Sequence, residues 1–259
     1  MKFVKYKQLC SIAIALISTF SIIHLQKSNL KIQSEKKEKI SYAREERAFK
    51  TTIEIQKKLP TLGFKNLIAD WNYLQFIQYL GDVEAREVTG YSLVTDYFEV
   101  AVDKDPLFTQ AFLSFSAANS LFAGQPKKTV ELIDKVLESS SPNLPGYPFL
   151  LWTYKATDEI LFMGDIKAAK KSYEKAAEWA SVRDDEIGTE MASRYQSTVK
   201  FLAANPDSTE AQIGAWMTVL EQAQDSKTQQ HAIDELKTLG VDISITEEGR
   251  MKVKRNRRA

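Results

Sequence analysis

Cysteine and histidine are scarce in this sequence, with one Cys and two His among 259 residues. A single Cys cannot form an intramolecular disulfide, and three such residues in total argue against a Cys/His metal cluster, so we expect no metal and no cofactor. Glycine and proline are also few, at ten and seven, which argues against a long disordered chain. A mean hydropathy of −0.31 is too low for a polytopic membrane protein, and the length fits one or two domains.

Charge is balanced overall but not along the chain. Residues 1–50 hold 11 Lys or Arg against four Glu, and residues 250–259 hold six Lys or Arg and no acid. The body between them, residues 51–249, holds 18 bases against 30 acids. This split indicates that the ends and the body face different surroundings, although solvated basic tails would give the same pattern.

An uncharged apolar run, Leu9–Leu25, follows three lysines at the N-terminus. Seventeen helical residues span roughly 25 Å, at the short end of the range for a transmembrane helix. No small-x-small pair follows the run where a signal peptidase would cut. We therefore predict that residues 1–26 are an uncleaved membrane anchor. The alternative is an exported soluble protein whose signal peptide is removed.

The side of the membrane that holds the body is ambiguous in the sequence. Eight Lys or Arg in residues 27–50 would keep the body in the cytoplasm by the positive-inside rule. A short basic leader before the span is typical of exported signal-anchors, and long domains translocate largely regardless of charge. We favour the lumenal or periplasmic side. Residues 27–60, with thinly spread apolar positions, are predicted to be a charged helical spacer.

Residues 61–240 show helical periodicity with an internal repeat. Gly81-Asp82, Gly124-Gln125 and Gly164-Asp165 each end an aromatic-rich helix, at spacings of 43 and 40 residues, and another helix follows each pair. The prolines lie at junctions. One helix pair cannot cover its own apolar face, so several must stack. The sequence thus predicts an all-α domain of stacked helix pairs.

The clearest copy of the repeat resembles a tetratricopeptide repeat. Gly164 matches the turn glycine of that motif, Ala169 and Ala176 its small residues, and Tyr173 its aromatic residue. This resemblance implies a right-handed α-solenoid with a concave protein-binding surface. The segment 62–82 followed by Thr89-Gly90-Tyr91 is similar to the opening of membrane-anchored tetratricopeptide-like proteins of cyanobacteria, which implies a thylakoid or plasma membrane.

Further helices are expected over 185–204, 209–223 and 227–239, the last capped by Ser226. The period then changes, because Val241, Ile243 and Ile245 alternate with polar residues before the turn at 247–249. Residues 241–259 are therefore predicted to form a small β-hairpin and a basic tail. Such a hairpin could cover the exposed end of the stack.

No constellation in the sequence supports catalysis, so we do not expect an enzyme. The acids at 184–186 fit a helix start, and consecutive residues do not share one helix face. His231, the one His in the body, is most simply a surface or packing residue.

The sequence favours a membrane-tethered interaction scaffold that binds a protein or peptide. Because the body is acidic, we expect this partner to be basic. By their positions in the repeats, the groove candidates are Trp71, Gln75, Gln78, Ser114, Ala118, Tyr154 and Asp158. An alternative is an assembly or maturation factor for a membrane complex, plausibly photosynthetic.

The basic ends lack a nucleic-acid reading module, and we expect them to contact anionic lipid through Lys2, Lys5, Lys7, Arg250, Lys252, Lys254, Arg255, Arg257 and Arg258.

Overall fold

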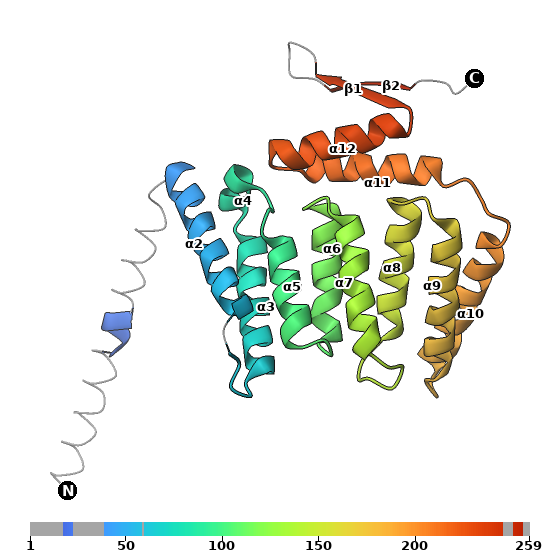
Figure 1. Ribbon diagram of the computed structural model, residues 1–259, viewed down its shortest axis with the longest axis horizontal. Coiled ribbons are helices and arrows are strands. Elements are labelled where there is room, and N and C mark those ends of the chain that lie inside the picture. Colours follow the sequence, from blue (N-terminus) through green and yellow to red (C-terminus); the bar gives the residue numbers. More distant parts are fainter. Residues whose placement is uncertain (1–17, 23–38, 59, 246–250, 256–259) are drawn as a thin grey trace, which may run out of the picture. The chain divides into compact units, whose positions relative to one another are not determined.

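The computed structural model describes residues 18–22, 39–58, 60–245 and 251–255, and the chain divides into the units Met1–Arg44 and Glu45–Ala259. The second unit is helical apart from a hairpin (Figure 1). Its elements are α2 (Lys39–Lys58), which begins in the first unit, α3 (Lys65–Gly81), α4 (Val83–Thr89), α5 (Val94–Lys104), α6 (Thr109–Leu121), α7 (Pro126–Ser139), α8 (Phe149–Leu161), α9 (Ile166–Ser181), α10 (Glu186–Leu202), α11 (Thr209–Gln222), α12 (Ser226–Thr238), β1 (Val241–Ile245) and β2 (Met251–Arg255).

Helices α3 and α5 to α10 stack in sequence order. Helix α3 packs on α5, α6 on α7 and α8 on α9, and α10 then packs on α9. The first helices of successive pairs also contact each other, as α6 and α8 do, and so do the second helices α5 and α7. The expected all-helical stack is confirmed, and its architecture is compatible with an α-solenoid.

Sequence periodicity explains how the pairs pack. Helix α7 starts with Pro126 in its first turn and buries Thr129, Leu132, Ile133 and Val136, which lie on one helix face. Helix α9 presents small residues instead, and Ala169 and Ala176 are fully buried. Their size lets α9 lie close to both of its neighbours, which agrees with the role expected of these two alanines.

Aromatic side chains fill the space between the first two pairs. The ring centroids of Phe76 and Phe115 are 4.2 Å apart, and Phe98 stacks on Phe115 at 5.3 Å. All three rings are fully buried. Because they come from α3, α5 and α6, this cluster joins one helix pair to the next.

The spacer prediction for 27–60 is wrong in its second half, because that part of α2 packs on the stack. Ile53 is 1% exposed and belongs to the core of the first two pairs. The Glu46 carboxylate accepts hydrogen bonds from Arg86 Nη1 at 3.1 Å and from the Tyr79 hydroxyl at 3.0 Å. Lys57 pairs with two carboxylates of α5 at 2.7 and 2.8 Å. The compact unit therefore begins at Glu45 rather than at 61.

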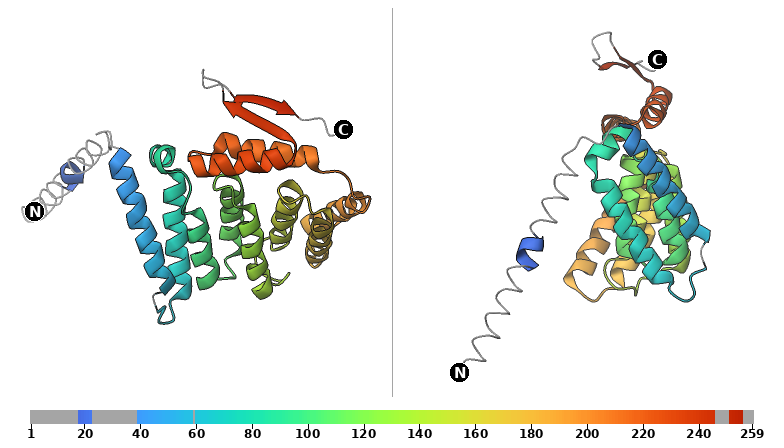
Figure 2. Two further views of the ribbon diagram at one scale, coloured as in Figure 1. Left: turned by 45° about the horizontal axis from the view of Figure 1, so that its top comes forward. Right: turned by 90° about the vertical axis from the view of Figure 1, so that its left-hand side faces the viewer.

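Helices α11 and α12 do not continue the stack. They run across the helix ends on one edge, roughly perpendicular to the stacked helices (Figures 1 and 2). Trp216 of α11 packs against Phe162, just past the end of α8, with ring centroids 5.1 Å apart. We call α11 and α12 together the strap. The expectation of one stack through residue 240 is thus wrong for its last two helices.

Glycines at the turns between helices let the strap approach. Gly90, Gly124 and Gly164 all have positive φ, at 68°, 61° and 63°. A Cβ on Gly90 would lie 2.5 Å from Asp225 Oδ2, and one on Gly124 would lie 3.1 Å from Thr228 Cγ2. A Cβ on Gly164 would meet the Gln212 side chain at 2.7 Å. Each turn therefore needs glycine for its backbone conformation, and there is little room for a side chain beneath the strap.

The C-terminal hairpin is confirmed. Strands β1 and β2 pair antiparallel, with Val241 opposite Arg255 and Ile245 opposite Met251. Val241 is buried in the cluster formed by α11 and α12, beside Leu236. The hairpin therefore extends the strap, and it does not cover the last stacked helix as the sequence suggested.

The strap contact can be tested at Gly90. We expect Gly90→Ala to lower the free energy of unfolding by about 1–3 kcal/mol, because φ 68° and ψ −156° disfavour a side chain and the methyl would meet Asp225. The matched control is Gly214→Ala, at an exposed position of α11 where nothing lies within 4 Å of the added carbon. It should leave stability unchanged or raise it by up to about 1 kcal/mol. Equal midpoints of urea denaturation for both variants would contradict the close approach.

Candidate functional site

The first helices of the stack leave one face open to solvent. We call this set the first-helix face; its members are exposed or half-buried and recur at i, i+3, i+4 and i+7 on each helix. They are Trp71, Leu74, Gln75 and Gln78 on α3; Gln110, Leu113, Ser114 and Ala117 on α6; Leu150, Thr153, Tyr154 and Thr157 on α8; and Glu190, Ser193, Arg194 and Ser197 on α10. Equivalent positions are 39 residues apart between α3 and α6 and 40 residues apart thereafter, whereas the turn glycines predicted spacings of 43 and 40.

Five of the seven expected groove residues belong to this face. Trp71 and Gln78 are exposed, and Gln75, Ser114 and Tyr154 are half-buried. Neighbouring first helices come together here, because the hydroxyls of Tyr73 on α3 and Ser114 on α6 are 3.3 Å apart.

Two groove assignments are wrong, since Ala118 is 2% exposed and Asp158 is 7% exposed. Each lies one residue beyond the open position of its helix, which is Ala117 or Thr157. One residue rotates the side chain by about 100° around the helix axis, and that rotation turns it from solvent into the core.

Several residues of the first-helix face were missed by sequence reasoning, namely Leu74, Gln110, Leu113, Ala117, Leu150, Thr153, Thr157 and the four positions on α10. A signal was available for part of the set, because the 40-residue glycine spacing takes the α6 positions to α8 and α10 in register. The first glycine spacing, 43 residues, differs from the 39 residues that separate equivalent positions on α3 and α6, so it gives the wrong register there.

The face is chemically neutral over most of its length. Its twelve positions on α3, α6 and α8 include no Asp, Glu, Lys or Arg, and charges first occur on α10, at Glu190 and Arg194. The acid excess of the body therefore lies beside this face rather than on it. Amide, hydroxyl and apolar side chains such as these suit contact with another polypeptide segment.

A buried polar network lies directly beneath the face and ends at Asp158. The Asn119 amide nitrogen donates to Thr129 Oγ1 at 3.0 Å. Ser120 Oγ lies 2.9 Å from Thr129 Oγ1 and 2.6 Å from Asp158 Oδ2. These residues come from α6, α7 and α8, so the network joins the second helix pair to the third.

Burial raises the pKa of Asp158 to about 7, against the opposing effect of the Ser120 hydroxyl. The single hydroxyl hydrogen of Ser120 cannot serve both of its neighbours. With Asp158 ionised, Ser120 donates to the carboxylate. With Asp158 protonated, the acid donates to Ser120, which then donates to Thr129. The hydrogen-bond directions between two helix pairs thus depend on one proton.

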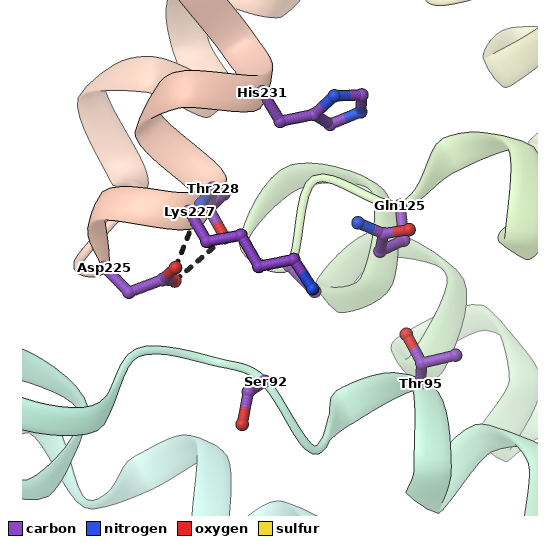
Figure 3. Close-up of a pocket in the computed structure, with 8 residues that line it drawn as sticks. Ser92, Thr95, Gln125, Asp225, Lys227, Thr228 and His231 are labelled. Carbon is purple, nitrogen blue, oxygen red and sulfur yellow. Dashed lines mark hydrogen bonds between the residues drawn. The ribbon is translucent and has the colours of Figure 1, made fainter.

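A pocket of about 480 Å³ lies between the strap and the stack (Figure 3). It is lined by Ser92, Thr95, Ala123, Gln125, Asp225, Lys227, Thr228 and His231. Asp225 is already engaged, because it accepts hydrogen bonds from the Thr228 amide at 2.9 Å and the Thr228 hydroxyl at 2.8 Å. Asp225, rather than the expected Ser226, thus caps α12.

The other polar groups of the pocket also have structural roles. Thr95 donates to Asn119 Oδ1 at 2.6 Å and so joins the network that ends at Asp158. His231 packs edge-on against Trp216 at 5.2 Å, in agreement with the packing role expected of it. Among the described residues, no group of three or more His, Cys, Asp or Glu could hold a metal ion.

The expected membrane contacts fall largely outside the described residues. Of the run 9–25, only 18–22 are described, and these are helical. None of the helices in the described ranges is long and apolar enough to cross a bilayer. The basic residues Lys2, Lys5, Lys7, Arg250, Arg257 and Arg258 also lie outside them, whereas Lys252, Lys254 and Arg255 are exposed on β2, with Arg255 paired to Glu210.

Comparison with known proteins found no matching family model, no similar curated protein and no similar solved structure.

The protonation of Asp158 predicts a distinctive pH profile. Its folded pKa is raised, so its favourable contribution is present at low pH and is lost as pH rises from about 4 through about 7. The free energy of unfolding of Asp158→Asn, relative to the parent chain, should therefore rise by on the order of 2–3 kcal/mol between pH 5 and 8. Asp184→Asn, at an exposed position, is the control and should track the parent. Parallel urea-denaturation profiles for all three would contradict a buried, neutral Asp158.

Proposed function

We propose that this chain is a membrane-tethered, non-catalytic scaffold that binds a protein partner on the first-helix face of a right-handed, tetratricopeptide-like solenoid. The observation that carries the proposal is the face itself, which repeats in register on α3, α6, α8 and α10. The turn glycine and small residues around Gly164 support the same interpretation. Stacked pairs of this kind present an extended surface to a partner.

The chemistry of the face defines the kind of partner. Its central positions on α6 and α8 are neutral or apolar, so the bound segment should present apolar and amide or hydroxyl groups there. The surrounding body is acidic, since residues 66–249 hold 29 acids against 15 bases. A segment with basic flanks would be attracted to this surface, mainly through a faster association rate.

The tether is proposed at residues 1–26, with the body on the lumenal or periplasmic side. The uncharged run Leu9–Leu25 supports the anchor because it has the length of a short transmembrane span. The exposed Lys252 and Lys254 of the hairpin could add contacts with anionic lipid, each worth about 1 kcal/mol near the surface.

Photo-crosslinking in cells tests the binding face. A photoreactive amino acid at Gln110, exposed on α6, should yield a discrete adduct with a partner protein. The same group at Ser139, exposed on the second helix α7, is the matched control and should not. Thr157→Arg, one repeat further along the face, should reduce the Gln110 adduct about tenfold or more, because it places an unpaired charge against a neutral surface.

Two results would count against the proposal. Equal adducts from Gln110 and Ser139 would indicate nonspecific encounter. A Gln110 adduct that persists unchanged in Thr157→Arg would indicate a partner bound elsewhere on the stack.

A further inference from the structure

The turn between α2 and α3 exposes an unusual group of apolar side chains. Leu62 is 84% exposed and Phe64 is 65% exposed. Leu67 and Ile55 are also exposed, and together with Trp71 they line one hollow of about 530 Å³ between α2 and α3. We call Ile55, Leu62, Phe64, Leu67 and Trp71 the α2–α3 patch. Trp71 is also a member of the first-helix face.

The backbone of the turn holds one of these side chains outward. Leu62 has φ 46°, a left-handed conformation that a branched residue rarely adopts, and Gly63 follows with φ 91°. A hydrogen bond from the Phe64 amide to the Thr61 carbonyl, at 2.7 Å, closes the turn. This turn conformation keeps the Leu62 side chain almost wholly in solvent, where it is available for contact.

The segment that carries most of the patch is rich in exposed basic side chains. Over residues 45–65 the exposed charged side chains are Arg47, Lys50, Lys58 and Lys65 against Glu54. The exposed acids near this end are Asp70 on α3 and Asp103 on α5. Asp103 pairs with Lys104, which also donates to the Lys57 carbonyl at 3.4 Å. The remainder of the body is acidic, with 29 acids against 15 bases over 66–249. The apolar patch therefore coincides with a locally basic part of the body.

We propose that the α2–α3 patch is a membrane-contact site that inserts Leu62 and Phe64 into the interface of an anionic bilayer. Apolar and aromatic side chains flanked by Lys and Arg are the composition that binds the headgroup region. Lys58 and Lys65 lie beside headgroup phosphates, and Trp71 lies at the interface between headgroups and chains. The acidic remainder of the body is repelled by the same surface, which orients this end toward the lipid.

A second copy of the chain fits the patch less well. A symmetric pair would bring two copies of this basic segment to one interface, and like charges at an interface are unfavourable. A lipid surface of opposite charge has no such cost.

This inference rests on the proposed anchor, and the chain between that anchor and α2 is long enough to permit the contact. Thirteen residues separate Leu25 from the start of α2, and they can extend over at most about 45 Å. Helix α2 has 20 residues and is about 30 Å long. The connection is thus long enough for α2 to run back and bring its C-terminal turn to the membrane.

The test uses the full chain with Cys10→Ser and one new cysteine carrying an environment-sensitive fluorophore. Phe64→Cys reports on the patch, and Phe201→Cys is the control, since Phe201 is 63% exposed on α10. The chain is reconstituted in vesicles of phosphatidylcholine with phosphatidylglycerol, in which some lipids carry a shallow nitroxide. We expect severalfold stronger quenching at position 64 than at 201, and weaker quenching at 64 in phosphatidylcholine alone.

Charge reversal provides a second readout at exposed positions that should not affect folding. Lys58→Glu with Lys65→Glu should reduce quenching at position 64 severalfold in anionic vesicles. Lys167→Glu with Lys171→Glu, which alters two exposed lysines of α9, should not.

Three results would overturn the inference. One is equal quenching at 64 and 201. The second is protection of position 64 from aqueous iodide without quenching by lipid, which would show that a polypeptide covers the patch. The third is insensitivity to Lys58→Glu with Lys65→Glu. Vesicle flotation separates the two proposals. If the chain floats but position 64 shows no lipid contact, the proposed anchor stands and the proposed contact site is wrong. If the chain floats with neither kind of vesicle, both proposals are wrong.

Discussion

The contact between the strap and the turns of the stack is the constraint on which the rest of the body depends. Helix pairs in a solenoid contact only their neighbours, so small changes of angle at each interface can accumulate along the stack. Here α11 and α12 reach three successive turns, at Gly90, Gly124 and Gly164. A helix pair laid across several repeats fixes their relative positions at one edge. The first-helix face is therefore built on a braced framework, which the proposed binding role would need.

Beneath that face, the same framework includes a titratable group. Asp158 joins the second and third pairs through Ser120 and Thr129, with a pKa near neutrality. Its buried position is the repeat equivalent of Ala118, so the third pair replaces a methyl group with a carboxyl. The proton state of one side chain thus changes the polar contacts between the two helix pairs that contribute the centre of the face. Under the proposed function, partner binding that alters this interface would be linked to pH.

The sequence predicted the stack well and the site less well, for reasons that differ by residue. Pro126, Ala169 and Ala176 follow local rules of helix start and close packing, so their roles were predictable. The position of the strap was not predictable, because α11 has the same local sequence pattern as a stacked helix. Only its contacts with distant turns distinguish it from one. Ile53 was missed for a similar reason, since a sparse apolar pattern in α2 gives little sign that its last turns are buried. The errors at Ala118 and Asp158 are one-residue errors of helical phase, which single-sequence reasoning cannot avoid without a fixed register.

Native-state hydrogen exchange of the full chain measures the central claim most directly. If the strap and the stack form one body, amides in α11 and α12 should share the opening free energy of amides in α5 to α8, and all should respond to denaturant with the same slope. A strap that exchanges at much lower denaturant, while α5 to α8 remain protected, would contradict the account, because the first-helix face would then be unbraced.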